Sequence, residues 1–297
     1  MDQIDAMRIY TRVAELGSFT ATADSLGVLK ATVSNAVQQL ENTLGTRLLH
    51  RTTRKVQMTQ DGQTYYERCR DLLVDVDELN ILFSADNQTT LRGRLRVDLP
   101  LALARDLVIP RLPEFLKPHP QLEIELSSTD RRVDLVREGF DCVVRIGNVG
   151  DQNLIAVPLG SFEQFNCCSQ AYLQQYGTPT GPDELGNHRL IHYAQTLGTR
   201  PQGFEYVSPR SSETVYVPMA GVITVNNSDA YREACRAGLG IIQAPRVGTY
   251  LAEGTLVEVL PDYRPAPLPI MLLYANRRHL PLRVKAFIEW MKQIIQH

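Results

Sequence analysis

Polar side chains along one helical segment have the types and spacing needed to read DNA. They are Lys30, Thr32, Ser34, Asn35 and Gln38, on the outward side of a helix predicted over residues 30–44. Ammonium, hydroxyl and amide groups can hydrogen-bond base edges in the major groove. A solvated helix face explains this pattern equally well, so the interpretation depends on the neighbouring segments.

The residues before that helix have the spacing of a helix-turn-helix. Ala23 is small enough to let two helices cross closely, and Gly27 tolerates the positive φ of the turn between them. Leu26 and Val33 are expected to pack inward. An apolar stripe that ends at Gly17 predicts one further helix before this pair.

A basic segment follows the candidate reading helix. The stretch RLLHRTTRKVQMTQ, residues 47–60, has the alternation of a short hairpin or wing. Residues 30–60 carry five lysines and arginines against one glutamate, although the whole chain has a net charge of -2. The candidate phosphate contacts are Arg47, Arg51, Thr52, Arg54 and Lys55. Because a reading helix needs cations beside it to hold phosphates, this segment favours DNA binding over a solvated face.

A long helix is predicted from residue 60 to residue 88. Its apolar residues repeat at steps of four and three, which is the spacing of a helix-pairing seam. The members of this heptad seam are Tyr65, Cys69, Leu72, Val76, Leu79 and Phe83. The seam can pair two copies of the chain as a dimerisation surface, or it can pack the helix against its own domain.

Short strands alternate with helices from residue 92 to the end of the chain. Segments such as QLEIELSS and FDCVVRIG are strand-like, and RRVDLVREG between them is helical. Strand and helix in alternation predict an α/β domain with a largely parallel sheet.

A family resemblance covers nearly the whole chain. The segment ELGSFTATADSLGVLKATVSNAVQQLENTLGTRLLHRTTRKVQMTQDG resembles the winged helix-turn-helix of LysR-type transcriptional regulators. Downstream, RGRLRVDLP, LVREGFDCVVRIG, LIAVPLG, AGLGIIQAP and RRHLPLRVKAFIEW resemble the effector domain of that family. Two positions depart from the usual family pattern: Leu29 stands where a serine or similar helix cap is usual, and Asn35 often has a basic counterpart.

The resemblance implies a fold and a division of the chain. The class is α/β, with an N-terminal all-α winged helix-turn-helix, a long linker helix and a two-lobed effector domain like periplasmic binding proteins. The implied boundaries are residues 1–59 for DNA binding, 60–88 for the linker and dimerisation helix, and 92–297 for the effector domain. Lobe one is residues 92–163 with 267–297, and lobe two is residues 164–266. The implied function is sequence-specific, effector-controlled regulation of transcription.

The effector site is expected beyond the carboxyl ends of the strands, where ligands of open α/β sheets bind. The candidates are Leu101, Ala102, Ser128, Thr129, Arg145, Gly147, Asn227 and Ser228. Arg145 suits a ligand carboxylate or an ion pair at the surface or between the lobes, and the polar residues suit ligand contacts or helix caps. Leu101 and Ala102 stand where relatives often have a polar residue, which leaves room for a more apolar ligand.

Other chemistry has weaker support in the sequence. We expect no cofactor, no metal and no catalytic residue, because the histidines lack metal-site spacing and no G-x-S-x-G occurs. Cys167 and Cys168 suit a buried strand, with a redox switch as the minor alternative. The expected partners are promoter DNA, a small effector and further copies of the chain, in the cytoplasm and away from membranes. The rival is a solute-binding module or enzyme built on the two lobes.

Overall fold

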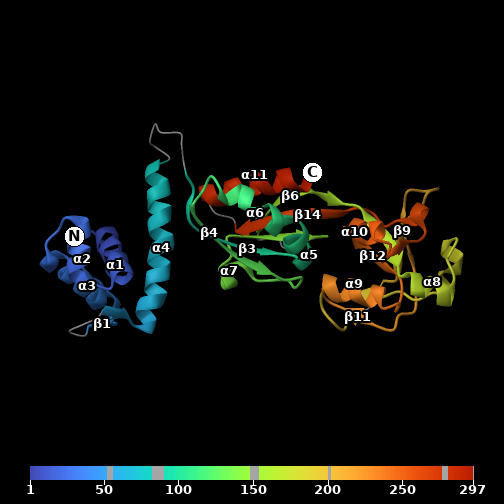
Figure 1. The fold of residues 1–297 in the computed structure, drawn as a ribbon, viewed down its shortest axis with the longest axis horizontal. Coiled ribbons are helices and arrows are strands. Elements are labelled where there is room, and N and C mark those ends of the chain that lie inside the picture. Colours follow the sequence, from blue (N-terminus) through green and yellow to red (C-terminus); the bar gives the residue numbers. More distant parts are fainter. Residues whose placement is uncertain (52–55, 82–89, 148–153, 200–201, 276–279, 297) are drawn as a thin grey trace. The chain divides into compact units, whose positions relative to one another are not determined.

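The computed structural model describes residues 1–51, 56–81, 90–147, 154–199, 202–275 and 280–296, and the side chains of Arg51, Glu78, Asn80 and Ile81 are left out of the description (Figure 1). These residues form two compact units. The first unit contains residues 1–94 and 119–123, and the second contains residues 95–118 and 124–297. Among the described residues, no helix is both long and apolar enough to cross a lipid bilayer.

The first unit is a winged helix-turn-helix followed by a long helix, shown in blue and cyan in Figure 1. Its elements are α1 (Gln3–Leu16), α2 (Phe19–Leu26), α3 (Lys30–Leu44), β1 (Leu49–Arg51), β2 (Val56–Met58) and α4 (Gln60–Ile81). Gly17, Gly27 and Gly45 end the first three helices in the left-handed conformation. Glycine adopts this conformation without a Cβ clash, so the predicted helix ends are confirmed.

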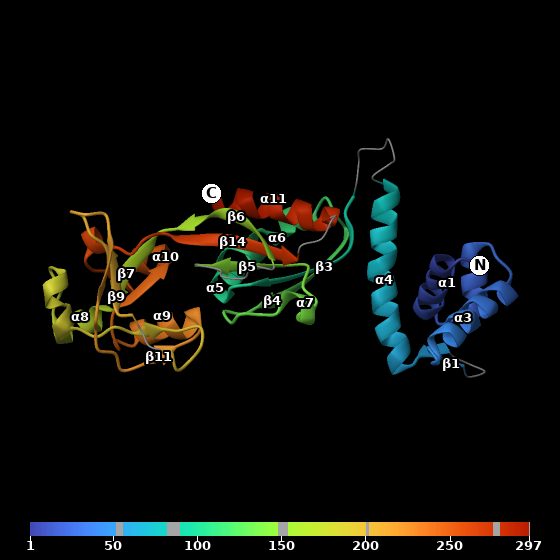
Figure 2. The same cartoon turned by 180° about the vertical axis from the view of Figure 1, so that it is seen from behind.

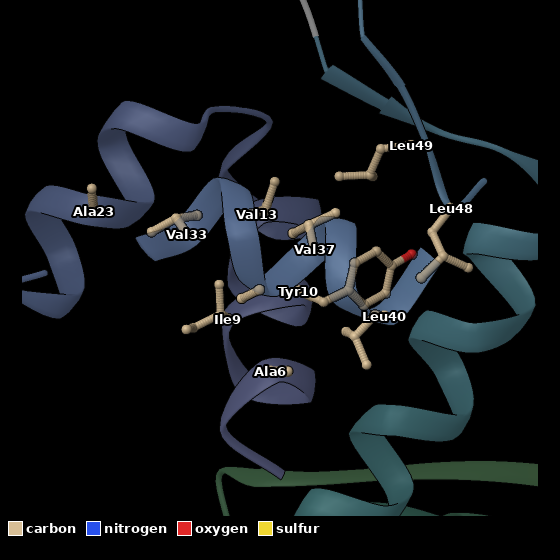
Figure 3. Close-up of a cluster of buried hydrophobic side chains, with 11 residues drawn as sticks. Ala6, Ile9, Tyr10, Val13, Ala23, Val33, Val37, Leu40, Leu48 and Leu49 are labelled. Atoms are coloured by element: carbon tan, nitrogen blue, oxygen red, sulfur yellow. The ribbon is translucent and has the colours of Figure 1, made fainter. Parts of the chain in front are cut away.

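The core of this unit lies between α1 and α3. Figure 3 shows Ile9, Tyr10 and Val13 of α1 facing Val33 and Val37 of α3, with Leu48 and Leu49 closing the cluster. The hydroxyl of Tyr10 donates a hydrogen bond of 2.8 Å to the carbonyl oxygen of Gly62. The prediction for Leu26 is wrong, because 41% of this residue is exposed. Ala23 is 4% exposed and makes the helix contact that its small side chain predicts.

In the second unit, residues of lobe one form a sheet with helices packed on it. Within the described residues the strand order is β4-β3-β5-β14-β6. The strands are β3 (Arg92–Leu99), β4 (Gln121–Ser128), β5 (Cys142–Ile146), β6 (Leu154–Phe162) and β14 (Leu268–Ala275). Strand β3 runs parallel to β5, whereas β14 runs antiparallel to both β5 and β6. The sheet of lobe one is therefore mixed: β3, β5 and β6 run in one direction, as a largely parallel sheet requires, and β14 runs against them. The C-terminal strand returns to lobe one from lobe two and enters the sheet in the opposite direction.

Helices complete lobe one. They are α5 (Leu101–Leu103), the π-helical turn η1 (Ala104–Val108), α6 (Ile109–Leu116), α7 (Leu135–Glu138) and α11 (Leu282–Gln296). In Figures 1 and 2, α11 lies along β6 and β14. Phe115 of α6 stacks on Trp290 of α11 with ring centroids 4.9 Å apart.

Lobe two has smaller sheets and short helices. Its strands are β7 (Gln164–Cys168), β8 (His192–Tyr193), β9 (Phe204–Val207), β10 (Thr214–Val217), β11 (Thr224–Val225), β12 (Ile242–Pro245) and β13 (Val257–Glu258). Its helices are α8 (Gln170–Tyr176), η2 (Pro182–Asn187), α9 (Ser228–Arg236), α10 (Gly248–Ala252) and η3 (Pro261–Tyr263). Strand β7 pairs antiparallel with β12 and β13, and β8 pairs parallel with β11. Gly238 follows α9 with a φ of 80°, so the sequence GLGIIQ ends that helix and leads into β12.

Candidate DNA-binding and effector sites

The structure places the candidate reading side chains on the free side of α3. Lys30, Asn35 and Gln38 are exposed, and Thr32 and Ser34 are half-buried. The opposite side of the helix carries Val33, Ala36, Val37 and Leu40, which are buried in the core. The packing that holds α3 in place therefore leaves its polar side open to solvent.

The carboxylate of Glu41 fixes the turn that follows α3. Its Oε1 accepts hydrogen bonds from the backbone N–H groups of Leu48 and Leu49, at 2.9 and 3.1 Å. These two bonds satisfy amide groups that enter β1, so the start of the wing is tied to α3. Sequence reasoning treated Glu41 as a stray acid in a basic block and missed this role.

The first turn of α3 lacks a side-chain cap in the described structure. Its N-cap residue Leu29 has the extended backbone of a cap, but a leucine side chain cannot accept a hydrogen bond. The side chain is 77% exposed, beside the N-terminal end of the reading face. The departure noted in the sequence thus leaves an apolar group on the candidate DNA-binding surface.

The wing carries the candidate phosphate contacts. Arg47 is exposed, and the backbone of Arg51 pairs with Val56 across the hairpin. Thr52, Arg54 and Lys55 lie outside the described residues, as does the side chain of Arg51.

A glycine and a threonine join the wing to α4. The hydroxyl of Thr59 accepts a hydrogen bond from the Gly62 amide at 2.9 Å and donates one to the Arg47 carbonyl at 2.7 Å. A Cβ at Gly62 would lie 2.0 Å from the carbonyl oxygen of Leu48. The spacing of Thr59 and Gly62 at the start of α4 therefore has a steric basis.

The structure divides the predicted heptad seam of α4. Tyr65 packs against the core of its own unit, and Cys69 is only 2% exposed, which agrees with the alternative in which this part of the helix packs against its own domain. Spacing identifies an apolar side but not the surface that covers it. Leu72 is 45% and Leu79 is 56% exposed, and Val76 between them is half-buried. Phe83 lies outside the described residues.

A cavity of about 770 Å³ lies between lobe one and lobe two. Four of the predicted effector residues line it: Ala102, Thr129, Arg145 and Ser228. Among the described residues that line the cavity, Leu101, Ser128, Gly147 and Asn227 are absent. Four of the eight predicted effector residues therefore lie at the cavity, and the other four lie outside its described lining.

Asn227 and Gly147, which lie outside the described lining of the cavity, have structural roles. The Asn227 side chain caps α9 by accepting a hydrogen bond from the Ala230 amide at 2.8 Å. Gly147 has a φ of 94° and donates its N–H to the Pro269 carbonyl, which joins the end of β5 to β14. The hydroxyls of Ser128 and Ser228 are buried without a hydrogen-bond partner among the described residues.

Arg145 is held by a carboxylate of the protein itself. Its Nη2 lies 2.6 Å from Oδ2 of Asp98, and Asp98 is fully buried. The same guanidinium donates to the carbonyl oxygens of Val144 and Arg131, at 2.7 and 3.2 Å. Arg145 therefore forms an ion pair, as one interpretation predicted, but the pair is buried within lobe one and lies neither at the surface nor between the lobes.

The cavity is also lined by polar residues that the sequence analysis did not predict. They include Asp130, Gln164, His192, Tyr193, Glu205, Tyr216, Tyr231 and Gln243. Most of them lie in lobe two, on strands of two to five residues. Such short strands contain too few residues for an alternating pattern to be recognised in the sequence. A search for polar residues next to the predicted strand ends would have found Asp130, since it follows Thr129 directly.

Burial shifts the titration of two cavity groups. Burial lowers the pKa of His192, which favours the neutral imidazole. Burial raises the pKa of Glu205, and hydrogen bonds from Tyr216 and from the backbone of Ala266 lower it in part.

The cysteines of lobe two belong to its core. Cys167 and Cys168 are fully buried in β7, and burial raises the pKa of each thiol to about 12. The packing interpretation of this pair therefore holds. Within the described residues, no group of three or more histidine, cysteine, aspartate or glutamate side chains is placed to hold a metal ion.

Comparison with known proteins gives matches to both parts of the chain. Residues 4–63 match the family model "Bacterial regulatory helix-turn-helix protein, lysR family", and residues 88–296 match "LysR substrate binding domain". The chain is 45% identical over 298 residues to the "Uncharacterized HTH-type transcriptional regulator YhjC" of Escherichia coli (strain K12), covering 100% of this chain and 99% of that protein. It is 36% identical to an HTH-type transcriptional repressor of Pseudomonas aeruginosa (strain UCBPP-PA14), covering 99% and 92%. The full-length structure of the Vibrio cholerae virulence activator AphB has a TM-score of 0.57 and 29% identity, covering 100% of this chain and 99% of that one.

Proposed function

The chain belongs to the LysR family of transcriptional regulators, and we propose that α3 reads its DNA while the cavity between the lobes holds its effector. It is a DNA-binding transcription regulator and not an enzyme, which removes the rival interpretation. Its fold is the expected winged helix-turn-helix followed by an α/β effector domain.

The DNA-reading role of α3 is supported by its exposed polar face. Asn35 and Gln38 carry amide groups that can pair with adenine edges, and Lys30 can reach guanine or phosphate. Arg47, Arg51, Arg54 and Lys55 would neutralise phosphates beside the groove, and Thr52 would hydrogen-bond to one.

The observation that carries the effector proposal is the position of the cavity. Its lining comes from both lobes: Thr129 and Arg145 belong to lobe one, whereas Tyr193, Tyr231 and Gln243 belong to lobe two. A ligand that touches both lobes binds one lobe arrangement better than another, and this difference in affinity is what can shift the regulator between states. A tenfold difference corresponds to about 1.4 kcal/mol.

Self-association would use the exposed part of α4. Leu72, Val76 and Leu79 follow one another at steps of four and three, and Leu72 and Leu79 are exposed in the single chain. Covering such a strip with the same strip of a second copy removes apolar surface from water. In that assembly two copies of α3 would face two half-sites.

DNA reading is tested by fluorescence anisotropy on DNA from upstream of the gene, against scrambled DNA, at several salt concentrations. We expect tight, sequence-dependent binding that weakens steeply with salt. Gln38→Ala should weaken specific binding about tenfold to a hundredfold, since a good bidentate base contact is worth about 1–3 kcal/mol. Gln174 is an exposed residue of α8 in the effector domain. Gln174→Ala is therefore the matched control and should leave DNA binding unchanged. Equal weak binding to both DNAs would contradict the proposal.

Effector binding is tested with compounds that raise the melting temperature of the full chain. Thr199 is exposed and lines the cavity, so Thr199→Trp should obstruct part of the cavity without disturbing the core. Thr178→Trp places the same side chain at an exposed position of lobe two that is not part of the lining. We expect Thr199→Trp to abolish the shift and Thr178→Trp to keep it. Compounds that bind both variants equally would place the effector site elsewhere.

A further inference from the structure

The carboxylate of Asp130 bridges the two lobes at the cavity. Its Oδ1 accepts a hydrogen bond of 3.0 Å from the backbone N–H of Leu101 in lobe one. Its Oδ2 accepts one of 2.6 Å from the backbone N–H of Ser228 in lobe two. One side chain therefore satisfies two amide groups that lie on opposite sides of the cleft.

Those two amides form an anion-binding position. Ser228 is the first residue of α9, and Leu101 begins the helical segment that continues through η1 and α6. Backbone N–H groups at the start of a helix have no partner within the helix and carry partial positive charge. Such groups attract a carboxylate or phosphate oxygen. In this chain they receive the oxygens of Asp130.

The buried cations of the cavity are also engaged by the protein. Arg145 pairs with Asp98 at 2.6 Å. Arg232 is 3% exposed and lies 3.3 Å from a carboxylate oxygen of Asp106. Arg132 lies at the exposed rim, where its Nε donates to the amide oxygen of Gln195 at 3.4 Å.

Apart from the rim residue Arg132, the remaining lining favours ligands without a negative charge. Glu205 brings a carboxyl group to the cavity wall, and Tyr193, Tyr216 and Tyr231 bring aromatic rings. The rings of Tyr193 and Tyr231 meet edge to face, with centroids 5.4 Å apart. Aromatic faces and carboxylates attract cationic groups, and tyrosine and glutamine side chains hydrogen-bond neutral polar groups.

We propose that Asp130 is a built-in anion that occupies the position where a carboxylate ligand would bind, so that the effector of this regulator is a neutral or cationic molecule. This inference rests on the proposed function, because it concerns the ligand of the same cavity. It also gives Asp130 a second role, which is to hold the lobes together at the cleft until a ligand adds its own contacts.

The test is chemical rescue of a variant that lacks the carboxylate. Asp130→Ala removes the side chain and leaves the Leu101 and Ser228 amides facing an empty position. Sodium formate or sodium acetate should then raise the melting temperature of the full-length variant saturably, relative to sodium chloride at equal ionic strength. The wild-type chain should show no saturable shift with either anion. Asp134→Ala is the matched control, because Asp134 accepts a hydrogen bond from the Arg137 amide on α7, outside the cavity lining.

Either of two results would overturn the proposal. One is a folded Asp130→Ala variant that formate and acetate do not stabilise beyond the chloride control or beyond Asp134→Ala. The other is a saturable stabilisation of the wild-type chain by these anions, which can be measured even if Asp130→Ala does not fold. Because the assay contains neither DNA nor effector, its failure is distinct from the failure of Thr199→Trp to block an effector.

Discussion

The polar groups on α3 and those at the cavity are built into the molecule in opposite ways. Lys30, Asn35 and Gln38 extend from a helix whose other side is packed, so their polar ends face solvent. At the cavity, the charges of Arg145 and Arg232 are matched by carboxylates of the same unit.

The difference shows how one chain can address two kinds of partner. An exposed helix face can meet DNA, whose phosphate charge is nearly the same at every sequence. Amide and hydroxyl groups on that face are then the groups that distinguish one base from another. An enclosed cavity selects its ligand by which of its own charged groups already have partners in the protein. The reason is that burying a charge without an opposite charge beside it costs free energy. Four substitutions or treatments test this contrast, from the largest expected effect to none.

The largest effect is expected from Asp98→Ala in the effector unit. The substitution leaves the guanidinium of Arg145 buried without its carboxylate, which costs about 3–5 kcal/mol of unfolding free energy. Urea denaturation measures the loss. Glu123→Ala breaks the exposed Arg70–Glu123 pair of 3.2 Å and should cost less than about 1 kcal/mol. Equal losses of unfolding free energy in the two variants would mean that burial does not determine how much each ion pair contributes to stability.

Gly62→Ala is expected to have the next largest effect, in the DNA-binding unit. The new Cβ would lie 2.0 Å from the Leu48 carbonyl oxygen, so α4 or the wing must move. The expected cost is about 1–3 kcal/mol, with a fall in DNA affinity in the anisotropy assay. Gly186→Ala meets no atom within 4 Å and serves as the control. A variant with normal stability and DNA affinity would show that this junction adapts freely.

Leu29→Ser should stabilise α3 by about 1 kcal/mol, because serine supplies the missing N-cap oxygen. The reverse change is available in the same unit. Ser18 caps α2 by accepting a hydrogen bond from the Ala21 amide at 3.2 Å, so Ser18→Ala should lose a similar amount. Thermal unfolding of the two variants compares these effects. If Leu29→Ser also changes the preferred base at one position of the DNA site, the exposed leucine contributes to DNA reading.

No effect is expected from mild oxidation of the lobe two cysteines. Cys167 and Cys168 are fully buried, and a pKa of about 12 keeps both thiols protonated at neutral pH. Since the thiolate is the reactive form, iodoacetamide and hydrogen peroxide should modify them only after unfolding. Mass spectrometry of native and urea-unfolded protein checks this. Rapid modification of either thiol in the native chain would restore the redox interpretation.

The sequence predicts the first unit well because its determinants are local. Residues 30–44 end at Gly45, which stops the helix in the left-handed conformation, and the periodic apolar residues before it have one packed side. Apolar spacing is less informative where the surface that covers a helix comes from a distant part of the sequence. The spacing of Tyr65 and Cys69 marks them as apolar neighbours, but α1 and its core cover them in place of a second chain. Leu26 was assigned inward by position alone and is exposed.

The cavity is harder to predict because its residues come from segments that are distant in the sequence. Strand ends located Thr129 and Ser228, but the pairing of Arg145 with Asp98 joins residues on two different strands. The antiparallel course of β14 also follows from the return of the chain after lobe two, which no local pattern encodes. Strand periodicity therefore indicates where a ligand site lies, and long-range pairing decides what it accepts.

The bridge made by Asp130 has a consequence for how such a regulator can change over generations. An aspartate codon is a single nucleotide change away from codons for alanine and glycine. On the proposal made above, such a change would open the anion position while leaving the reading helix and both lobes as they are. A descendant of this gene could then answer to an acidic metabolite at an unaltered promoter, and selection could act on the new response in one step.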